Sequence, residues 1–200
     1  MSEKLKFVGI DLAGSEKRET GFCVMDERVF VNTKILFKDS EIIEEVRKAR
    51  PKVIAIDAPL ALPKGRLGLE KKYAKFGHLR ECDKQLLKMR IKFFPITLGP
   101  MRRLTLRGMN LKKMLEKDGF KVIETYPGGA QDILKIPRKR NLKKLRKGLE
   151  RMGIKGFKRE LNEHELDAIT CALVGKMYIE GKYMALGDEK EALLILPKDG

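Results

Sequence analysis

The stretch KFVGIDLAGSE, at residues 6–16, decides which fold the sequence predicts. Its apolar run meets a single carboxylate, Asp11, which small residues follow. The same pattern returns in PKVIAIDAPLALP, at residues 51–63, where a second apolar run ends at Asp57. Runs that are apolar at consecutive positions are typical of strands buried on both faces of a sheet. Two such strands, each ending in an acid, predict a pair of carboxylates at one edge of a sheet.

Alternating apolar and polar residues predict that the chain continues from the first strand as an antiparallel meander. The segments TGFCVMDE, at 20–27, and RVFVNTKILF, at 28–37, have this strand pattern, and the break between them is short enough for a hairpin. A helix is expected over 39–50, where Pro51 ends it. The strand at 52–57 then lies inside the sheet, parallel to the first strand.

The remaining segments continue with helices and one further predicted strand. We expect a strand at 121–127, a final candidate strand at 192–197, helices at 80–92, 102–120, 138–153 and 162–181, and a short helix or turn at 128–136. The order β-β-β-α-β-α-β-α is the connectivity of the ribonuclease-H-like fold. The sequence therefore predicts a single α/β domain over residues 1–200. Its mixed five-stranded sheet has three antiparallel strands and then parallel ones, with flanking helices and a helical insertion at about 58–100.

The net charge of +16 is concentrated in one part of the chain. Between Met101 and Glu160, 19 lysine or arginine residues stand against 6 acids, which accounts for most of the excess. Such a region attracts polyanions and favours nucleic acid as a partner. The alternative is the solvated surface of a heat-adapted protein, because a charged share of 36% is typical of thermophiles. Thermophile surfaces usually balance their charges, and this one does not.

Cysteine usage and hydropathy favour a cytoplasmic protein without a membrane partner. The three cysteines, Cys23, Cys82 and Cys171, are odd in number and far apart, which predicts reduced core thiols and no disulfide framework. No apolar run is long enough to span a bilayer, and no signal-peptide pattern precedes the first strand.

The two strand-end acids predict a metal centre. Carboxylates a few Å apart repel each other unless a cation joins them, and Mg²⁺ or Mn²⁺ prefers oxygen ligands. The last predicted helix adds His164 and Asp167, which are three residues apart and share a face. Asp167 has apolar neighbours, where an acid is costly unless it faces a site. We expect Asp11, Asp57 and Asp167 to hold the metal, while His164 binds metal or handles protons.

Several other polar residues allow two interpretations. Glu124 interrupts an apolar strand and is either a catalytic acid or a charge on an edge strand. Tyr126 either stacks on a nucleobase of the substrate or packs in the fold. Glu163 and Glu165 suit the N-terminus of a helix, and Glu165 is expected to face solvent.

Two short patterns are candidates for phosphate binding. Arg80 and Asp83 stand three residues apart on a predicted helix, either as a phosphate clamp with its orienting acid or as a surface ion pair. The turn DLAGS, which ends at Ser15, is close to the D-x-G-x-[ST] turn that cradles phosphate in ATP-using enzymes of the actin type.

Five motifs in order, VGIDLAG, IDAPL, RECD, ETYP and HELDAITCALVG, resemble the DUF429 family, described as predicted nucleases with a ribonuclease-H-like fold. The resemblance covers nearly the whole chain and implies that fold with its inferred catalytic centre. The acids are also similar to those of the RuvC Holliday-junction resolvases. The residues that match the resolvase pattern are Asp11, Asp57 and the pair His164 and Asp167. Those resolvases have Glu where Asp57 stands, and they have no counterpart of residues 58–100. Junction-specific cleavage is therefore not implied.

The expected function is a metal-dependent nuclease that hydrolyses phosphodiester bonds of DNA or RNA. One alternative is an ATP-binding phosphotransferase or ATPase of the actin-like fold, although Ala58 and Pro59 stand where a backbone approach to phosphate would need glycine. Another is a nucleic-acid-binding protein that has lost catalysis. The sequence leaves the oligomeric state open, with a homodimer as the state that junction cleavage would need.

Overall fold

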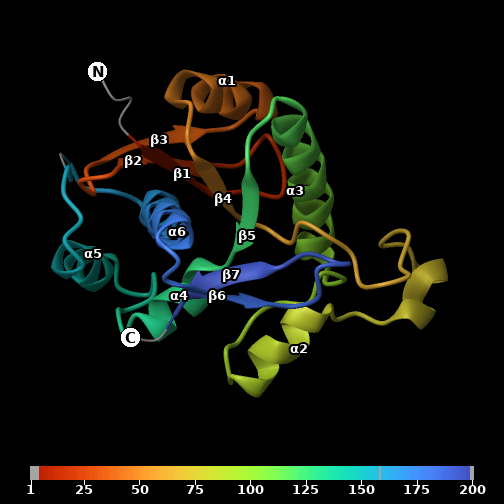
Figure 1. Ribbon diagram of the computed structural model, residues 1–200. Coiled ribbons are helices and arrows are strands. Elements are labelled where there is room, and N and C mark those ends of the chain that lie inside the picture. Colours follow the sequence, from red (N-terminus) through yellow and green to blue (C-terminus); the bar gives the residue numbers. More distant parts are fainter. Residues whose placement is uncertain (1–4, 158, 199–200) are drawn as a thin grey trace.

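A computed structural model describes residues 5–157 and 159–198, in which one mixed sheet runs through the molecule (Figure 1). Its strand order is β3-β2-β1-β4-β5-β7-β6. The strands are β1 (Lys6–Asp11), β2 (Thr20–Asp26), β3 (Val31–Leu36), β4 (Val53–Asp57), β5 (Val122–Thr125), β6 (Tyr183–Leu186) and β7 (Leu194–Pro197).

The pairing of β1 confirms the expected connectivity around the first strand. β1 is antiparallel to β2 and parallel to β4, and Asp11 lies directly opposite Asp57 in the register. β5 continues the parallel part of the sheet beside β4. Because β1 and β4 are covered on both faces, their side chains are apolar at nearly every position.

The expected number of five strands is wrong, because the sheet has seven. β7 lies parallel to β5, and β6 lies antiparallel on the outer side of β7. β7 is the final candidate strand of the sequence. β6 is short and half-exposed, and it follows a helix directly, so its sequence has no clear alternating pattern.

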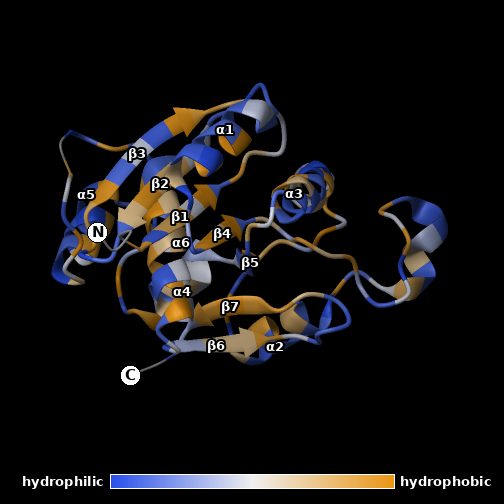
Figure 2. Cartoon of the chain, turned by 45° about the horizontal axis from the view of Figure 1, so that its top comes forward, coloured by the Kyte–Doolittle hydropathy of each residue, from blue (hydrophilic) through white to orange (hydrophobic). Residues whose placement is uncertain are grey.

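Helices cover both faces of the sheet (Figure 1). On one face α1 and α3 pack against the even-numbered side chains of β1 and β4, and on the other face α6 packs against the odd-numbered ones. Figure 2 shows the central strands as largely apolar, whereas the outer helices carry both apolar and polar residues. The helices are α1 (Asp39–Ala49), α2 (Glu81–Lys88), α3 (Gly99–Lys117), α4 (Pro127–Ile133), α5 (Leu142–Arg151) and α6 (Glu163–Ile179).

The chain between β4 and α3, which we call the 58–98 segment, is mostly irregular. It contains a 3-10 helix, η1 (Lys71–Phe76), and the short α2. The expected helical insertion at about 58–100 is therefore not confirmed. The part around η1 stands out from the body of the molecule in both views (Figures 1 and 2).

No helix in the described part of the chain is both long and apolar enough to cross a bilayer.

Two glycines let α6 approach the sheet closely. A Cβ atom at Gly9 of β1 would lie 2.0 Å from the carbonyl oxygen of Ala168, and one at Gly21 of β2 would lie 2.0 Å from that of His164. Real Cβ atoms do not approach backbone this closely, so neither position has room for a side chain. The helix is thereby seated directly over the end of β1 that carries Asp11.

We predict that Gly9→Ala destabilises the protein strongly. Overpacking typically costs about 1–3 kcal/mol, and here the clash is with backbone that cannot rotate away, so we expect a loss of about 3 kcal/mol or more in urea unfolding. Gly99→Ala is the matched control, because its Cβ would meet nothing within 4 Å, and its change should stay within about 1 kcal/mol. Equal losses in the two variants would contradict the packing argument.

Candidate functional site

Two carboxylates meet where β1 and β4 end. Asp11 and Asp57 are paired in a parallel register, so their side chains leave the same face of the sheet. Asp11 is buried, and Asp57 is partly so. The structure thus brings together the two acids that the sequence placed at one edge of the sheet.

The start of α6 lies over this edge and adds two of the expected residues. His164 Nδ1 is 2.8 Å from Asp11 Oδ2, and the ring is 30% exposed. Asp167, one turn further along the helix, is buried. The negative charges of Asp11 and Asp167 both raise the pKa of Asp57, so these three acids, which we call the acid cluster, act on one another electrostatically.

A capping box holds the start of α6 in place. The Asn162 side chain accepts a hydrogen bond from the backbone N–H of Glu165, and the Glu165 carboxylate accepts one from the backbone N–H of Asn162. Glu165 also accepts a hydrogen bond from Thr33 and pairs with Arg159 at 2.6 Å. The expectation that Glu165 faces solvent is wrong, because these contacts bury it and anchor the helix to β3.

Sequence reasoning missed two residues of the site, Gln131 and Lys139. Gln131 Nε2 on α4 donates to Asp167 Oδ1 at 2.8 Å. Lys139, in the loop before α5, places its Nζ 3.3 Å from Asp167 Oδ2. Lys139 is one of many basic residues in its region, so only the folded geometry distinguishes it from its neighbours.

The charges of this cluster are only partly compensated. Burial raises the pKa of Asp57 well above its ordinary value, and the negative charges of Asp11 and Asp167 raise it further. Burial also raises the pKa of Asp167, against the opposing effect of Lys139. The hydrogen bond to Asp11 raises the pKa of His164, which favours an imidazolium beside the acids.

Asp57 is opposed only by the charge of Lys139, which lowers its pKa against the larger effects of burial, Asp11 and Asp167. Its carboxylate takes part in no hydrogen bond or ion pair with any residue of the described chain. An acid beside two others, with no donor of its own, is the place in this site where a cation would relieve the repulsion.

The donor set fits a hard divalent ion held by few protein ligands. Within 5–157 and 159–198, no group of three or more His, Cys, Asp or Glu side chains is close enough to bind one ion jointly. Mg²⁺ typically keeps several waters and takes only one or two carboxylates together with substrate phosphate. Asp11 and Asp57, adjacent on parallel strands, place two carboxylates of this kind side by side.

A cleft of about 210 Å³ opens beside Asp11 and His164. The turn after β1, including Ser15, forms one wall, and the first turn of α3 forms the other. Arg18 and Arg103 line the cleft, are exposed, and form no ion pair within the part of the chain that the structure describes. Unpaired guanidinium groups at a cleft suit phosphate oxygens.

Arg107 of α3 fixes the turn that forms this cleft. Its Nη1 donates to the carbonyl of Ala13 at 2.8 Å, and its Nη2 donates to the carbonyl of Phe37 at 2.6 Å. Its Nε contacts Asp39 at 2.8 Å, which balances the buried charge. The position of the turn therefore depends on α3 as well as on β1.

The structure does not bring Arg80, Asp83 and Glu124 to the acid cluster. Glu124 is in register with Ile56, so it leaves the face of the sheet opposite to Asp57. Arg80 is buried and donates to Asp83 at 2.9 Å and to Glu124 at 2.7 Å. Glu124 also accepts a hydrogen bond from the backbone N–H of Leu60. Both acids are thus occupied by a buried ion-pair network that ties the 58–98 segment to β5.

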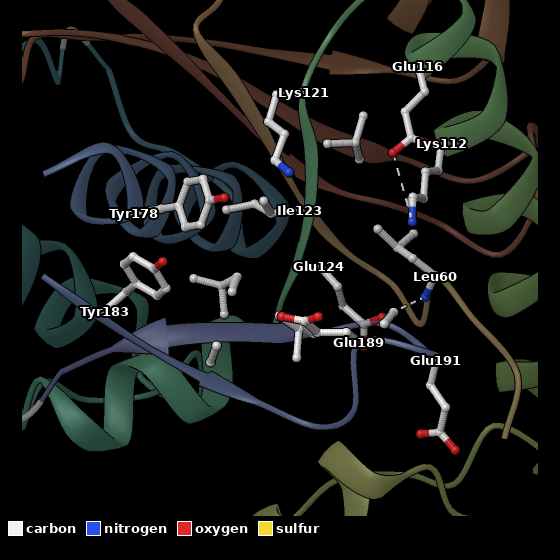
Figure 3. Close-up of a pocket in the computed structure, with 15 residues that line it drawn as sticks. Leu60, Lys112, Glu116, Lys121, Ile123, Glu124, Tyr178, Tyr183, Glu189 and Glu191 are labelled. Atoms are coloured by element: carbon white, nitrogen blue, oxygen red, sulfur yellow. Dashed lines mark hydrogen bonds and ion pairs between the residues drawn. The ribbon is translucent and has the colours of Figure 1, made fainter. Parts of the chain in front are cut away.

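Glu124 lines a different hollow, of about 300 Å³, between α3 and the outer strands (Figure 3). The close-up shows its carboxylate bonded to the backbone of Leu60, with Lys112 paired to Glu116 nearby. This arrangement separates Glu124 from the cleft beside Asp11.

Tyr126, directly after β5, has its hydroxyl engaged. It donates to the carbonyl of Lys92 at 2.7 Å, and Arg138 lies over its ring. Burial raises its pKa. In these contacts the residue packs the chain after β5 against the 58–98 segment.

Comparison with known families gives one match over most of the chain. A family model described as "Protein of unknown function (DUF429)" matches residues 9–192. No curated protein matches the sequence.

Solved structures of RuvC from Thermus thermophilus are similar to this chain. One is RuvC in complex with a Holliday junction substrate. It is 13% identical, with 95% of this chain and 99% of that chain covered and a TM-score of 0.49. The other, a Thermus thermophilus RuvC structure, is also 13% identical and covers 88% of this chain and 97% of that chain, with a TM-score of 0.46.

We predict that Asp57→Asn stabilises the metal-free protein at neutral pH. The folded pKa of Asp57 lies above its unfolded value, so its contribution to stability is present below the unfolded pKa and is lost as pH rises through the folded pKa. Asparagine does not ionise, so the variant does not lose this stability at high pH. A gain of about 1 kcal/mol would raise Tm by about 2–4 °C at pH 8 in a chelating buffer. The gain should shrink towards pH 4, and a lower Tm at both pH values would contradict the argument.

We predict that Arg80→Leu destabilises the fold. It leaves Asp83 and Glu124 buried without a counter-charge, a change that costs about 3–5 kcal/mol in comparable networks and is measured by urea unfolding. Arg47→Leu, which breaks the exposed pair with Asp118, is the control and should change stability by less than about 1 kcal/mol. A small loss in Arg80→Leu would mean that this guanidinium is not structural.

Proposed function

Since the chain belongs to the DUF429 family, as its motifs predicted, we propose from its own residues that it is a divalent-metal-dependent nuclease acting on DNA or RNA. The observation that carries the proposal is the Asp57 carboxylate, which forms no hydrogen bond or ion pair in the described chain, lies beside Asp11, and has its pKa raised by Asp167 as well. A buried cluster of acids is unfavourable for stability, and its arrangement is explained if a cation and a phosphate group complete it.

In this proposal Asp11 and Asp57 hold Mg²⁺ or Mn²⁺ through their oxygens, and Asp167 adds negative charge one helical turn from His164. When bound, such an ion supplies an activated water and neutralises charge on the phosphoryl oxygens. Gln131 and Lys139 fix the orientation of Asp167 by contacting both of its oxygens. Asp167 is thereby held in place before substrate arrives.

His164 is the proposed proton-transfer group. Its ring lines the cleft beside Asp11, and the hydrogen bond to Asp11 raises its pKa, which favours the imidazolium more than in a free histidine. A protonated imidazole at the wall of the cleft is placed to donate to the departing oxygen of a phosphodiester. Asp11 then orients the ring as well as sharing in cation binding.

The substrate backbone is held by basic residues around the cleft. Arg18 and Arg103 stand at its walls without carboxylate partners in the described chain, and their planar groups suit the oxygens of neighbouring phosphates. The basic helix α5 follows Lys139 directly and extends the positive surface away from the acids. The excess charge of residues 101–160 thus borders the site.

The alternative ATP-using enzyme gains no support from the cleft. The cleft has a volume of about 210 Å³, which lies below the range of about 300–1,000 Å³ typical of pockets that enclose small-molecule ligands. The alternative of a binding protein without catalysis is separated from the nuclease by the following experiment.

We predict that the protein cleaves labelled nucleic acid in the presence of Mn²⁺ or Mg²⁺ and that Asp11→Asn abolishes cleavage. The panel comprises single-stranded, duplex, hybrid and branched forms, assayed at room temperature and hot, with ATP hydrolysis in parallel. Loss of a direct ligand should reduce the rate by about 100-fold or more, since even supporting residues of metal sites are worth 10–100-fold.

Asp118→Asn is the control, because this acid follows the last residue of α3, at the end of the helix away from the cleft. It should keep the wild-type rate. Mn²⁺ should also raise the Tm of the wild type but not that of Asp11→Asn, which tests metal binding without turnover. Binding of nucleic acid with no cleavage and no metal-induced stabilisation would support the inactive binding protein, and ATP turnover would support the phosphotransferase.

A further inference from the structure

The 58–98 segment contains a hollow that the proposed chemistry does not use. It measures about 680 Å³ and is formed where the end of η1, the residues before α2 and the residues before α3 come together. Its walls include Phe76, His78, Leu79, Lys84, Pro95 and Thr97. His78 Nδ1 is 3.1 Å from Thr97 Oγ1, a contact that joins two sides of the hollow.

The segment exposes aromatic rings that the fold does not need for its core. Phe76 is 38% exposed and Phe94 is 68% exposed. Neither is a member of the two buried clusters that pack against the sheet. Phe76 lines the hollow, and Phe94 precedes Pro95 of its wall. An exposed aromatic group at a surface hollow is typical of a binding site.

Lysines accompany these rings. Lys75 Nζ lies 5.1 Å from the centre of the Phe76 ring, and Lys72 Nζ lies 5.0 Å from that of Tyr73. Lys84 adds a further ammonium group at the wall of the hollow, where it also pairs with the exposed Glu81 at 3.2 Å. Aromatic faces flanked by positive charge are the means by which proteins bind single-stranded nucleic acid, because bases stack on the rings and phosphates contact the cations.

The hollow lies close to the acid cluster along the chain. Thr97 lines the hollow, while Pro100 and Met101 line the cleft beside Asp11. Three residues span at most about 11 Å, so the walls of the two hollows come within that distance of each other along the chain. Arg102 donates to the carbonyl of Leu69 at 2.7 Å, which fixes the 58–98 segment to the start of α3.

We propose that this hollow binds an unpaired nucleobase of a single-stranded nucleic acid, stacked on Phe76, with Lys75 and Lys84 contacting the adjoining phosphates. The inference rests on the proposed function, since the strand held here continues into the cleft beside Asp11. Bases within a duplex are stacked and paired, so they cannot enter. The proposal therefore names the substrate class as DNA or RNA with a single-stranded segment.

A tryptophan reporter tests the stacking directly. The chain contains no tryptophan, so Phe76→Trp creates a single fluorophore in the hollow. We expect single-stranded oligonucleotides to quench its fluorescence in EDTA, where no cleavage occurs, and a blunt duplex of the same sequence to leave it unchanged. Phe30→Trp is the matched control. Phe30 is 50% exposed beneath Lys155, and it follows β2 at the opposite end of the sheet from Asp11.

Affinity supplies the second measurement. Removing one base-stacking ring should weaken binding of a labelled single-stranded oligonucleotide by about 10-fold in Phe76→Ala, with Phe76→Trp and Phe30→Ala close to wild type. Fluorescence anisotropy measures the affinity, and thermal unfolding verifies that each variant is folded. If Phe76→Ala does not fold, the fluorescence quenching of Phe76→Trp alone decides whether a base stacks in the hollow.

The outcomes separate this inference from the proposed function. Quenching in Phe76→Trp, without metal-dependent cleavage by the wild type, would support the base-binding hollow and overturn the nuclease. Cleavage by the wild type, with no quenching at saturating oligonucleotide and unchanged affinity in Phe76→Ala, would overturn the hollow and leave the nuclease. Equal quenching by duplex and single strand would also overturn the inference.

Discussion

The close approach of α6 to β1 and β2 is the constraint on which the site depends. Because Gly9 and Gly21 have no side chains, the backbone of α6 packs directly on the sheet. His164 and Asp167 therefore lie close to the end of β1. A helix displaced by even one methyl group would no longer place His164 at hydrogen-bond distance from Asp11. Packing in the centre of the molecule thus determines the geometry of polar groups at its edge.

Two buried groups of charges lie near the middle of the sheet, and they differ in balance. Around Arg80 each acid has a geometrically good donor, so the group links the 58–98 segment to β5 and stays stable as it is. Around Asp57 the donors contact Asp11 and Asp167 and none contacts Asp57 itself, and burial raises the pKa values of Asp57 and Asp167. A buried carboxylate without a donor is typical of a ligand-binding site, whereas a network in which every acid has a donor is typical of a structural role.

Local patterns predicted the central strands, because apolar runs on β1 and β4 and the helix spacing of His164 and Asp167 are short-range properties. They could not predict the role of Glu124, since strand register alone decides which face of the sheet it leaves. Lys139 and Gln131 contact Asp167 only after α4 and the following loop have packed against α6, so no spacing in the sequence indicates them. β6 was not predicted because four residues are too few to show an alternation of apolar and polar side chains.

The position of β7 between β5 and β6 has a consequence for how the chain acquires its fold. β7 is the last of the seven strands to be synthesised, yet it separates two strands that precede it. Until it emerges, β5 is an open edge whose backbone groups are free to pair with another chain. Folding during synthesis can complete the part from β3 to β5, but the outer strands join only afterwards. The chain is therefore most exposed to aggregation with its neighbours while it is being synthesised.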